Sequence, residues 1–203
     1  MSEVADFGGE DFESTKKMRL EPIEKPKSIF LKLAYWFSRR QFGVVLTPMK
    51  VIYARKPPLL SLAMKMSKFE EKQTSLPEDL RLFIKTATAT LNGCTFCQDI
   101  ALAQAVRGKI GTEKFTALLR NDDARLSAFT EKERAALAVI KEYDELKKVS
   151  DETFAELKKH FSETEIVEIL ALTAIEHFYN ALTIPLEIES DGLRQIAEQR
   201  KAN

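Results

Sequence analysis

Cysteine and histidine are scarce in this chain of 203 residues, which has two of each. A secreted disulfide framework is built from more cysteines than this. A structural zinc site takes about four cysteine or histidine ligands, and His160 and His177 stand at no recognised spacing from the cysteines. We therefore expect neither a disulfide scaffold nor a bound metal, and no motif calls for an organic cofactor.

Net charge is also absent, because 31 acidic side chains balance 31 basic ones. Nucleic-acid-binding domains usually carry a basic surplus, so we expect no nucleic-acid partner. Molecules without net charge repel one another weakly, which favours self-association. A hydrophobic share of 44% is enough for a proper core, and the length suits one domain with a tail.

Long hydrophobic runs are missing near the start of the chain. The first fifteen residues are acidic and contain no apolar core of a secretory signal. The apolar run over residues 29–37 is interrupted by Lys32 and is too short to span a bilayer. We expect a cytoplasmic protein, and in that compartment two cysteines are more often reactive than a permanent crosslink.

Residues 1–26 are predicted to be a mobile tail, because Gly8-Gly9, Pro22 and Pro26 disfavour a helix. Residues 27–203 are predicted to form a single all-α domain, since no segment alternates like a half-buried strand. Its helices should be antiparallel neighbours joined by short connections. The predicted ranges are 28–39, 48–56, 59–70, 77–91, 94–107, 112–119, 131–148, 153–160, 162–184 and 191–201.

Helix starts are marked by capping residues. Capping boxes are predicted for Ser75 with Glu78, Thr130 with Glu133, and Ser162 with Glu165. Single caps are predicted at Ser28, Thr112 and Ser150, and a polar turn is expected at residues 121–123.

The first predicted helix places Ile29, Leu33, Trp36 and Phe37 on one side, among several basic residues. One interpretation is a helix lying in a membrane surface. The other is an arm that packs on the core or on a neighbouring subunit. The apolar face is short, so we favour the arm and expect no membrane contact.

The two cysteines, Cys94 and Cys97, stand three apart at the predicted start of a helix. Positions i and i+3 share a helix face, so the sulfurs are within reach of a disulfide. The helix start favours a thiolate by about 0.3–1 kcal/mol, and by up to ~2 kcal/mol when partly buried. A thiolate attacks a peroxide or a disulfide, and the second cysteine then captures the oxidised sulfur. The spacing thus supplies a nucleophile and a resolving group.

The cysteine pair has other interpretations. Haem attachment requires a histidine directly after the second cysteine, where Gln98 stands. A thioredoxin fold needs a βαβ unit, and none is predicted. Two buried core residues without chemistry stay open as an alternative, because free cysteine is among the most buried residue types.

The segment Leu91-Asn92-Gly93-Cys94-x-x-Cys97, followed by Asp99, resembles the core of the carboxymuconolactone decarboxylase superfamily, most closely its alkylhydroperoxidase-D-like branch. The predicted helix that ends at residues 178–185 resembles that family's closing helix. The likeness covers roughly residues 43–192.

The resemblance implies an all-helical bundle that assembles as a homo-oligomer, a trimer or a hexamer, with the CxxC pair at the start of a core helix. It also implies a peroxidase activity in which Cys97 attacks a hydroperoxide and Cys94 resolves the product. An external dithiol would regenerate the pair, and no metal or cofactor would take part.

Two positions depart from the family pattern. Active relatives usually carry a histidine four residues after the second cysteine, where this chain has Ala101, and a glutamate twelve before the first, where it has Leu82. The loss of this proton relay predicts a weak peroxidase, because less of Cys97 would be thiolate. Candidate substitutes are Asp99, although two residues from Cys97 it points to another side of the helix, and His177 on the facing helix.

Further polar residues were assigned simpler roles. Gln98 is placed to hydrogen-bond the sulfur of Cys94. His177 has an alternative role as a hydrogen-bonded core or interface residue, and His160 is expected on the surface. Glu168 and Glu176 are expected on a solvated face, and Tyr179 and Asn180 in packing or subunit contacts.

Three functions follow in order of preference. The first is a thiol-dependent peroxidase or disulfide reductase that uses Cys97, Cys94, Asp99 and His177. The second is a non-enzymatic helical oligomer in which the pair is a redox sensor or structural. The third is decarboxylase chemistry, for which the sequence offers no clear set of groups.

Overall fold

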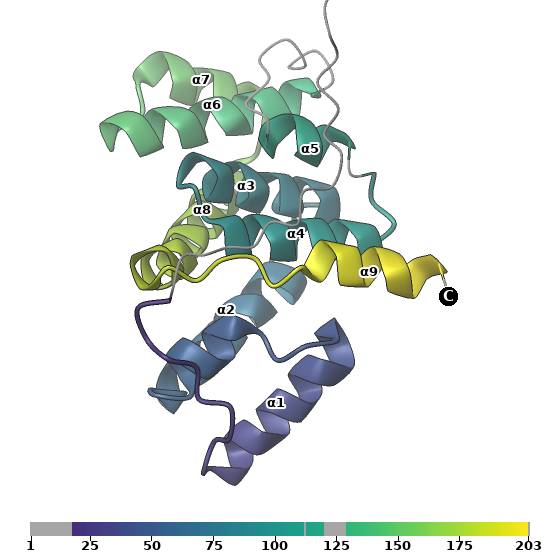
Figure 1. The fold of residues 1–203 in the computed structure, drawn as a ribbon. Coiled ribbons are helices and arrows are strands. Elements are labelled where there is room, and N and C mark those ends of the chain that lie inside the picture. The colour runs from purple at the N-terminus through teal and green to yellow at the C-terminus, as the bar shows by residue number, and fades with distance from the viewer. Residues whose placement is uncertain (1–17, 112, 120–128, 203) are drawn as a thin grey trace, which may run out of the picture.

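The structure is a computed structural model that describes residues 18–111, 113–119 and 129–202. All regular structure in these residues is helical, which confirms the predicted all-α class (Figure 1). The elements are α1 (Ile29–Phe42), η1 (Met49–Tyr53), α2 (Pro57–Lys72), α3 (Glu78–Leu91), α4 (Thr95–Arg107), α5 (Glu113–Leu119), α6 (Glu131–Leu146), α7 (Asp151–His160), α8 (Glu163–Thr183), η3 (Ile184–Leu186) and α9 (Leu193–Ala202). The predicted cap at Thr112 and the predicted turn at residues 121–123 lie outside the described residues.

Helix α3 lies at the centre of the fold and packs against α4, α5, α6 and α8 (Figure 1). Its sequence explains this position, because Leu80, Phe83, Ile84 and Ala87 recur at helical spacing and all are buried. Phe83 also packs edge-to-face on Phe129, with ring centroids 5.1 Å apart. Burial on several sides fixes the end of α3, where the turn into α4 begins.

Two of the three predicted capping boxes are confirmed. Thr130 and Glu133 exchange both hydrogen bonds at the start of α6, and Ser162 and Glu165 do the same at the start of α8. Ser150 also caps α7 as predicted, accepting a hydrogen bond from the backbone of Thr153. These local signals fix where the helices of the second half begin.

The third predicted box, Ser75 with Glu78, is wrong. Pro77 is the residue that precedes α3, and the carboxylate that binds Ser75 comes from Glu168 on α8. The backbone N–H groups of Ser75 and Leu76 and the hydroxyl of Ser75 donate to Glu168 over 2.9–3.2 Å. Glu168 is therefore buried rather than solvated, and a contact across 93 residues replaces the local box.

The segment before α2 differs from its prediction in helix type. The helix predicted from Pro48 is present over Met49–Tyr53, but it has π-helical hydrogen bonding. Pro57 begins α2 rather than only ending the preceding helix, because proline fits the first turn. On α2, Leu60 is buried and Leu62 is exposed.

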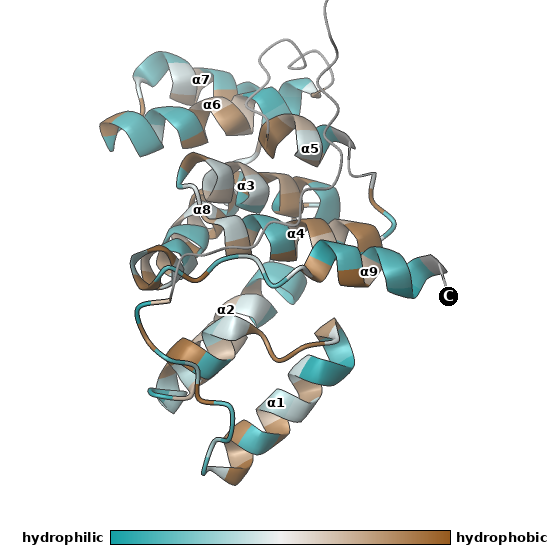
Figure 2. Cartoon of the chain, in the orientation of Figure 1, coloured by the Kyte–Doolittle hydropathy of each residue, from teal (hydrophilic) through white to brown (hydrophobic). Residues whose placement is uncertain are grey.

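Helix α1 packs on the body through the side opposite to the predicted one. Leu31 and Tyr35 are buried in a small cluster with Val45, Met49 and Leu60. The predicted apolar side faces solvent in the single chain, with exposed fractions from 52% to 85% for Ile29, Leu33, Trp36 and Phe37. Figure 2 shows hydrophobic residues, in brown, along α1. The helix is thus apolar on two sides, and only one of them packs on other residues in the described part of the chain.

Part of the predicted tail makes contacts with the body. The N–H of Arg19 donates to the carbonyl of Leu186, and the N–H of Ile23 donates to that of Lys50. The hydroxyl of Tyr35 in turn donates to the carbonyl of Ile23 at 2.7 Å. Residues 1–17, which make up most of that tail, lie outside the described residues.

One helix in the described part of the chain is long and apolar enough to cross a membrane, over Glu163–Leu186. It is α8 with the short turn after it, and it packs against α3, α4 and α7. Glu168 and Glu176 are both buried along it. Its apolar character comes with partners inside the fold, which is typical of a core helix.

Asp99 joins α4 to α9. Its carboxylate accepts hydrogen bonds from the hydroxyl of Ser190 and from the backbone N–H groups of Leu193 and Arg194, at 2.8–2.9 Å. These N–H groups belong to the first turn of α9, which has no helical partners for them. Asp99 is therefore the N-terminal cap of α9, supplied from a distant part of the sequence.

We expect Asp99→Ala to destabilise the protein by about 1–3 kcal/mol, because it leaves buried N–H groups of α9 unpaired. Denaturant unfolding measures this, and hydrogen exchange should show the largest gain in α9. Asp99→Asn, which retains an acceptor oxygen, should lose less. Equal stability of Asp99→Ala and the wild type would contradict the capping role.

Glu176 is the second buried glutamate of α8, and burial raises its pKa to about 7. A carboxyl whose pKa is raised in the folded state stabilises the protein at low pH, and this stability is lost as pH rises. We expect the unfolding free energy of the wild type, relative to Glu176→Gln, to fall between pH 4.5 and pH 7, by about 2–3 kcal/mol. Denaturant titrations across this range test it, and a constant difference would count against the burial effect.

Candidate active site

The predicted break between the two central helices is a tight turn at Asn92 and Gly93. Gly93 has a φ of +70°, a conformation that glycine adopts without strain. The N–H of Cys94 donates to the carbonyl of Ala89, which closes the turn. Cys94 then has an extended backbone and is the N-cap of α4. The local sequence thus places the first sulfur at the helix start, as predicted.

Cys94 and Cys97 are joined by a disulfide, with Cα atoms 5.3 Å apart. The prediction that they can bridge across the first turn of the helix is confirmed. The N–H of Cys97 lies 3.3 Å from the sulfur of Cys94, so the helix start is directed at that sulfur. Both side chains are buried, with exposed fractions of 1% for Cys94 and 5% for Cys97.

Helix α8 contributes two polar groups to the sulfurs. The side-chain amide of Asn180 donates to the sulfur of Cys97 at 3.0 Å. The hydroxyl of Thr183 lies 3.2 Å from the sulfur of Cys94 and 3.8 Å from that of Cys97. Each sulfur therefore has a polar neighbour from α8, inside an otherwise apolar cluster.

A network of side chains fixes the orientation of the Asn180 amide. The Nδ2 of Asn92 donates to the Oδ1 of Asn180 at 2.6 Å and lies 2.9 Å from the Nδ1 of His177. With the carbonyl of Asn180 engaged by Asn92, its Nδ2 is directed to Cys97 and to the Oε1 of Glu176, which is 2.8 Å away. These hydrogen bonds assign the positions of the oxygen and nitrogen atoms in the Asn180 amide.

His177 belongs to this network but does not contact a sulfur. Its Nδ1 faces Asn92, which assigns Nδ1 as the acceptor. Its Nε2 is buried without a hydrogen-bond partner and is 4.0 Å from a carboxylate oxygen of Asp144. Burial lowers the pKa of His177, and the opposing effect of Asp144 is smaller. A neutral imidazole two amides away from Cys97 positions the network rather than taking a proton from the thiol.

The other predicted polar residues lie elsewhere. The hydrogen bonds described for the carboxylate of Asp99 go to residues 190–194, so this residue caps α9 and does not face the sulfurs. Gln98 donates to the carbonyl of Ala89 at 3.4 Å rather than to Cys94, which corrects its predicted contact. His160 pairs with Glu156 at the end of α7, at the exposed margin of the fold.

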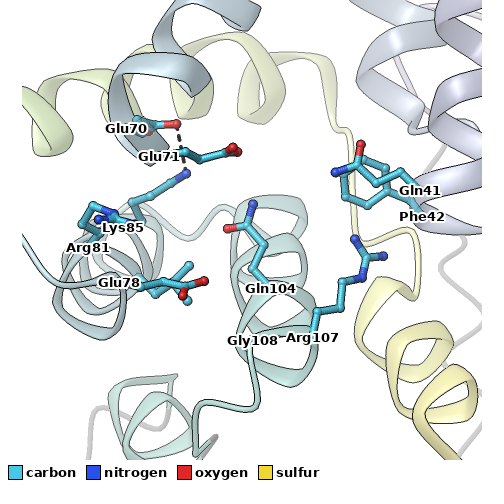
Figure 3. A pocket seen from close by; sticks show the side chains of 11 residues that line it. Gln41, Phe42, Glu70, Glu71, Glu78, Arg81, Lys85, Gln104, Arg107 and Gly108 are labelled. Carbon is cyan, nitrogen blue, oxygen red and sulfur yellow. Dashed lines mark hydrogen bonds and ion pairs between the residues drawn. The ribbon is translucent and has the colours of Figure 1, made fainter. Parts of the chain in front are cut away.

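The two positions of the missing relay are both apolar and buried. Leu82 and Ala101 have exposed fractions of 6% and 3%, so neither position offers a proton-carrying group. Leu82 also borders a cavity of about 320 Å³ between α2, α3, α4 and the end of α1. Figure 3 shows its charged lining, in which Lys85 and Glu70 form an ion pair at 3.3 Å.

Glu176, Asn180 and Thr183 were not predicted to belong to the site, although all three are buried there. A signal for them was present, because the spacings of four and three place them on one face of α8. Three polar residues on one face of an apolar helix need partners inside the protein. That face meets the cysteine turn, and the expectation of a solvated Glu176 is wrong.

Metal chemistry finds no support in the described part of the chain. No group of three or more histidine, cysteine, aspartate or glutamate side chains lies close enough to hold an ion there. The sulfurs are joined to each other, and their polar neighbours are an amide and a hydroxyl. The chemistry offered by this arrangement is that of a disulfide in a hydrogen-bonded setting.

Comparison with known proteins identifies a family that part of this chain matches. Residues 57–142 match the model of the carboxymuconolactone decarboxylase family. An uncharacterized protein of Bacillus subtilis strain 168, YdfG, is 24% identical over 136 residues, which are 66% of this chain and 90% of YdfG.

Solved structures extend the likeness to most of the chain. The alkylhydroperoxidase AhpD core of a peroxidase-related protein from Ralstonia eutropha JMP134 is 15% identical and superposes with a TM-score of 0.75, over 90% of this chain and 97% of that one. The debrominase Bmp8 is 20% identical and superposes with a TM-score of 0.72, over 90% and 98%. Residues 57–142 thus match the carboxymuconolactone decarboxylase family, and the helical fold around the CxxC pair is similar to that of these solved structures.

Proposed function

We propose that this protein is a thiol–disulfide oxidoreductase that reduces small hydroperoxides with Cys97 and Cys94. The observation that carries the proposal is the Cys94–Cys97 disulfide at the start of α4, with the Asn180 amide on one sulfur and the Thr183 hydroxyl beside the other. Hydrogen-bond donors at a sulfur favour its thiolate form, which is the nucleophile. A disulfide that was only structural would not need the Asn180 donor at Cys97.

The proposed cycle begins with the reduced pair. The thiolate of Cys97 attacks the outer oxygen of a hydroperoxide, the O–O bond breaks, and the alcohol leaves after taking up a proton. Cys97 is now a sulfenic acid, and the thiol of Cys94 attacks it to form the disulfide and release water. An external dithiol then reduces the disulfide by exchange and is itself oxidised. One hydroperoxide and one dithiol give one alcohol, one water and one disulfide.

The roles of the two cysteines rest on their surroundings. Cys97 accepts the amide hydrogen bond from Asn180 and is the less buried of the two. Cys94 faces the N–H of Cys97 at the helix start, which lowers the free energy of its thiolate as a leaving group when the disulfide is reduced. We therefore assign Cys97 as the attacking residue and Cys94 as the resolving one.

Burial of both sulfurs bears on the substrate. Exposed fractions of 1% and 5% leave room only for a small oxidant, or require the turn at Asn92 and Gly93 to open first. The same fold is shared by a peroxidase-related protein and by a debrominase, so the fold alone does not select the substrate. The site is what favours hydroperoxide, since its reduced form supplies two thiols, and the described polar neighbours of the sulfurs are an uncharged amide and a hydroxyl.

Replacing each cysteine separately tests the proposal. Cys97→Ser should lower the rate of hydroperoxide consumption by more than about 100-fold, because the nucleophile is lost. Cys94→Ser should complete one turnover and stop with a sulfenic acid on Cys97, detected by a sulfenic-acid probe and mass spectrometry. The disulfide of the wild type should reform after each turnover when a dithiol is supplied.

The contrary outcomes are distinct. A sulfenic acid on Cys94 in the Cys97→Ser protein, with an inert Cys94→Ser protein, would reverse the two roles. Resistance of the native disulfide to excess dithiol would instead identify a structural crosslink and end the proposal. Equal rates for the wild type and both variants would do the same.

A further inference from the structure

One buried ionisable group beside the sulfurs has no part in the proposed cycle. Glu176 on α8 is 3% exposed, and its Oε1 accepts a hydrogen bond from the Asn180 amide at 2.8 Å. The same nitrogen lies 3.0 Å from the sulfur of Cys97. The carboxyl oxygen and the sulfur are therefore no more than about 6 Å apart, since both lie within 3.0 Å of one atom.

The groups facing Glu176 come from each helix around it. Burial raises its pKa to about 7, Lys85 on α3 acts in the opposite direction, and Glu70 on α2 acts in the same direction as burial. Lys85 is paired with Glu70 at 3.3 Å, which offsets much of its positive charge (Figure 3). Tyr179 on α8 is also close, and Cys97 is the group on α4.

We propose that Glu176 is a positioning residue that acts through Asn180 and competes with Cys97 for a proton, so that ionisation of the carboxyl opposes formation of the Cys97 thiolate. This inference rests on the proposed function of Cys97. It gives the carboxyl of Glu176 an effect on the ionisation of Cys97 that the apolar side chains of Leu82 and Ala101 cannot have.

Charge repulsion between the carboxylate of Glu176 and the thiolate of Cys97 is the physical reason for this competition. A thiolate and a carboxylate within about 6 Å, at the effective dielectric constant of a protein site, repel each other by an amount equivalent to roughly 1–2 pH units. The amide of Asn180 adds to this competition, because its two N–H groups serve the sulfur and the carboxyl at once. An ionised carboxyl holds the amide more tightly and leaves less stabilisation for the sulfur.

The proton balance of the pair is simple. The state with a thiol and a carboxylate converts to the state with a thiolate and a carboxylic acid by moving one proton, with no change in net charge. In the oxidised protein the disulfide carries no charge, so the carboxyl ionises without this competition. Reduction of the disulfide therefore raises the pKa of Glu176 and draws a proton into the site.

The test uses the full chain carrying Cys94→Ser, so that Cys97 is its single cysteine. The ultraviolet absorbance of the thiolate, followed against pH, should rise in two steps or one broadened step when Glu176 is present. In the same protein with Glu176→Gln, it should rise in one ordinary step whose midpoint is lower by about 1–2 pH units. At a pH below both midpoints, the protein with Glu176→Gln should therefore contain about 10 to 100 times more Cys97 thiolate than the protein with Glu176.

Glu168→Gln is the matched control, because Glu168 is also a buried glutamate of α8 but binds Ser75 rather than the site. It should alter stability and leave the titration of Cys97 unchanged. Identical single-step titrations with and without Glu176→Gln would overturn the inference. If Glu176→Gln does not fold, an ordinary single step in the Cys94→Ser protein alone would also overturn it.

The same readout separates this inference from the proposed function. Thiolate absorbance requires no peroxide, so a coupled titration in a protein that consumes no hydroperoxide would refute only the proposed function. Hydroperoxide consumption together with an uncoupled titration would refute only the role of Glu176.

Discussion

The structure depends on how one polar face of α8 is buried. Glu168, Glu176, Asn180 and Thr183 lie along a helix with many apolar residues, and all four are buried. A buried polar group without a partner costs about 1–3 kcal/mol, and a buried charge costs more. Each of the four therefore needs a partner inside the fold. The required hydrogen bonds fix the position of α8 relative to the start of α3 and to the cysteine turn.

The partners come from segments far away in the sequence. Glu168 binds the residues before α3, and Asn180 binds both Asn92 and Cys97. Both ends of α3 therefore contact α8, and these two contacts fix the position of α3 in the core. The disulfide turn follows directly from the second of these ends. Its surroundings are set by packing, not by the CxxC motif alone.

The described part of the fold was largely predictable, since most helices carry strong start signals. The pairs Thr130–Glu133 and Ser162–Glu165 act within four residues, so local sequence is sufficient to find them. The pair Ser75–Glu78 has the same pattern but fails, because Glu168 reaches Ser75 from another helix. A local pattern cannot reveal a competitor that is 93 residues away.

The site was predictable only in part, because several of its contacts also join residues that are far apart in the sequence. The spacing of Cys94 and Cys97 predicts the disulfide, because that geometry lies within one helical turn. The role of Asp99 and the place of Glu176 depend on which helix faces which, and the sequence does not contain that information in local form. Polar residues on an apolar helix were the available clue, and they indicate burial rather than solvation.

The cap that Asp99 provides for α9 also links the two ends of the domain. Asp99 lies two residues after Cys97, and farther along α9 the guanidinium of Arg200 donates to the carbonyl of Gln41 at the end of α1. Between them, Ile196 lies so close to Gly43 that a Cβ added there would be 2.9 Å from its side chain. The last helix is thus a brace between the redox turn and the first helix. A chain cut short before residue 193 would lose the brace, and of the three described donors to the Asp99 carboxylate only the Ser190 hydroxyl would remain.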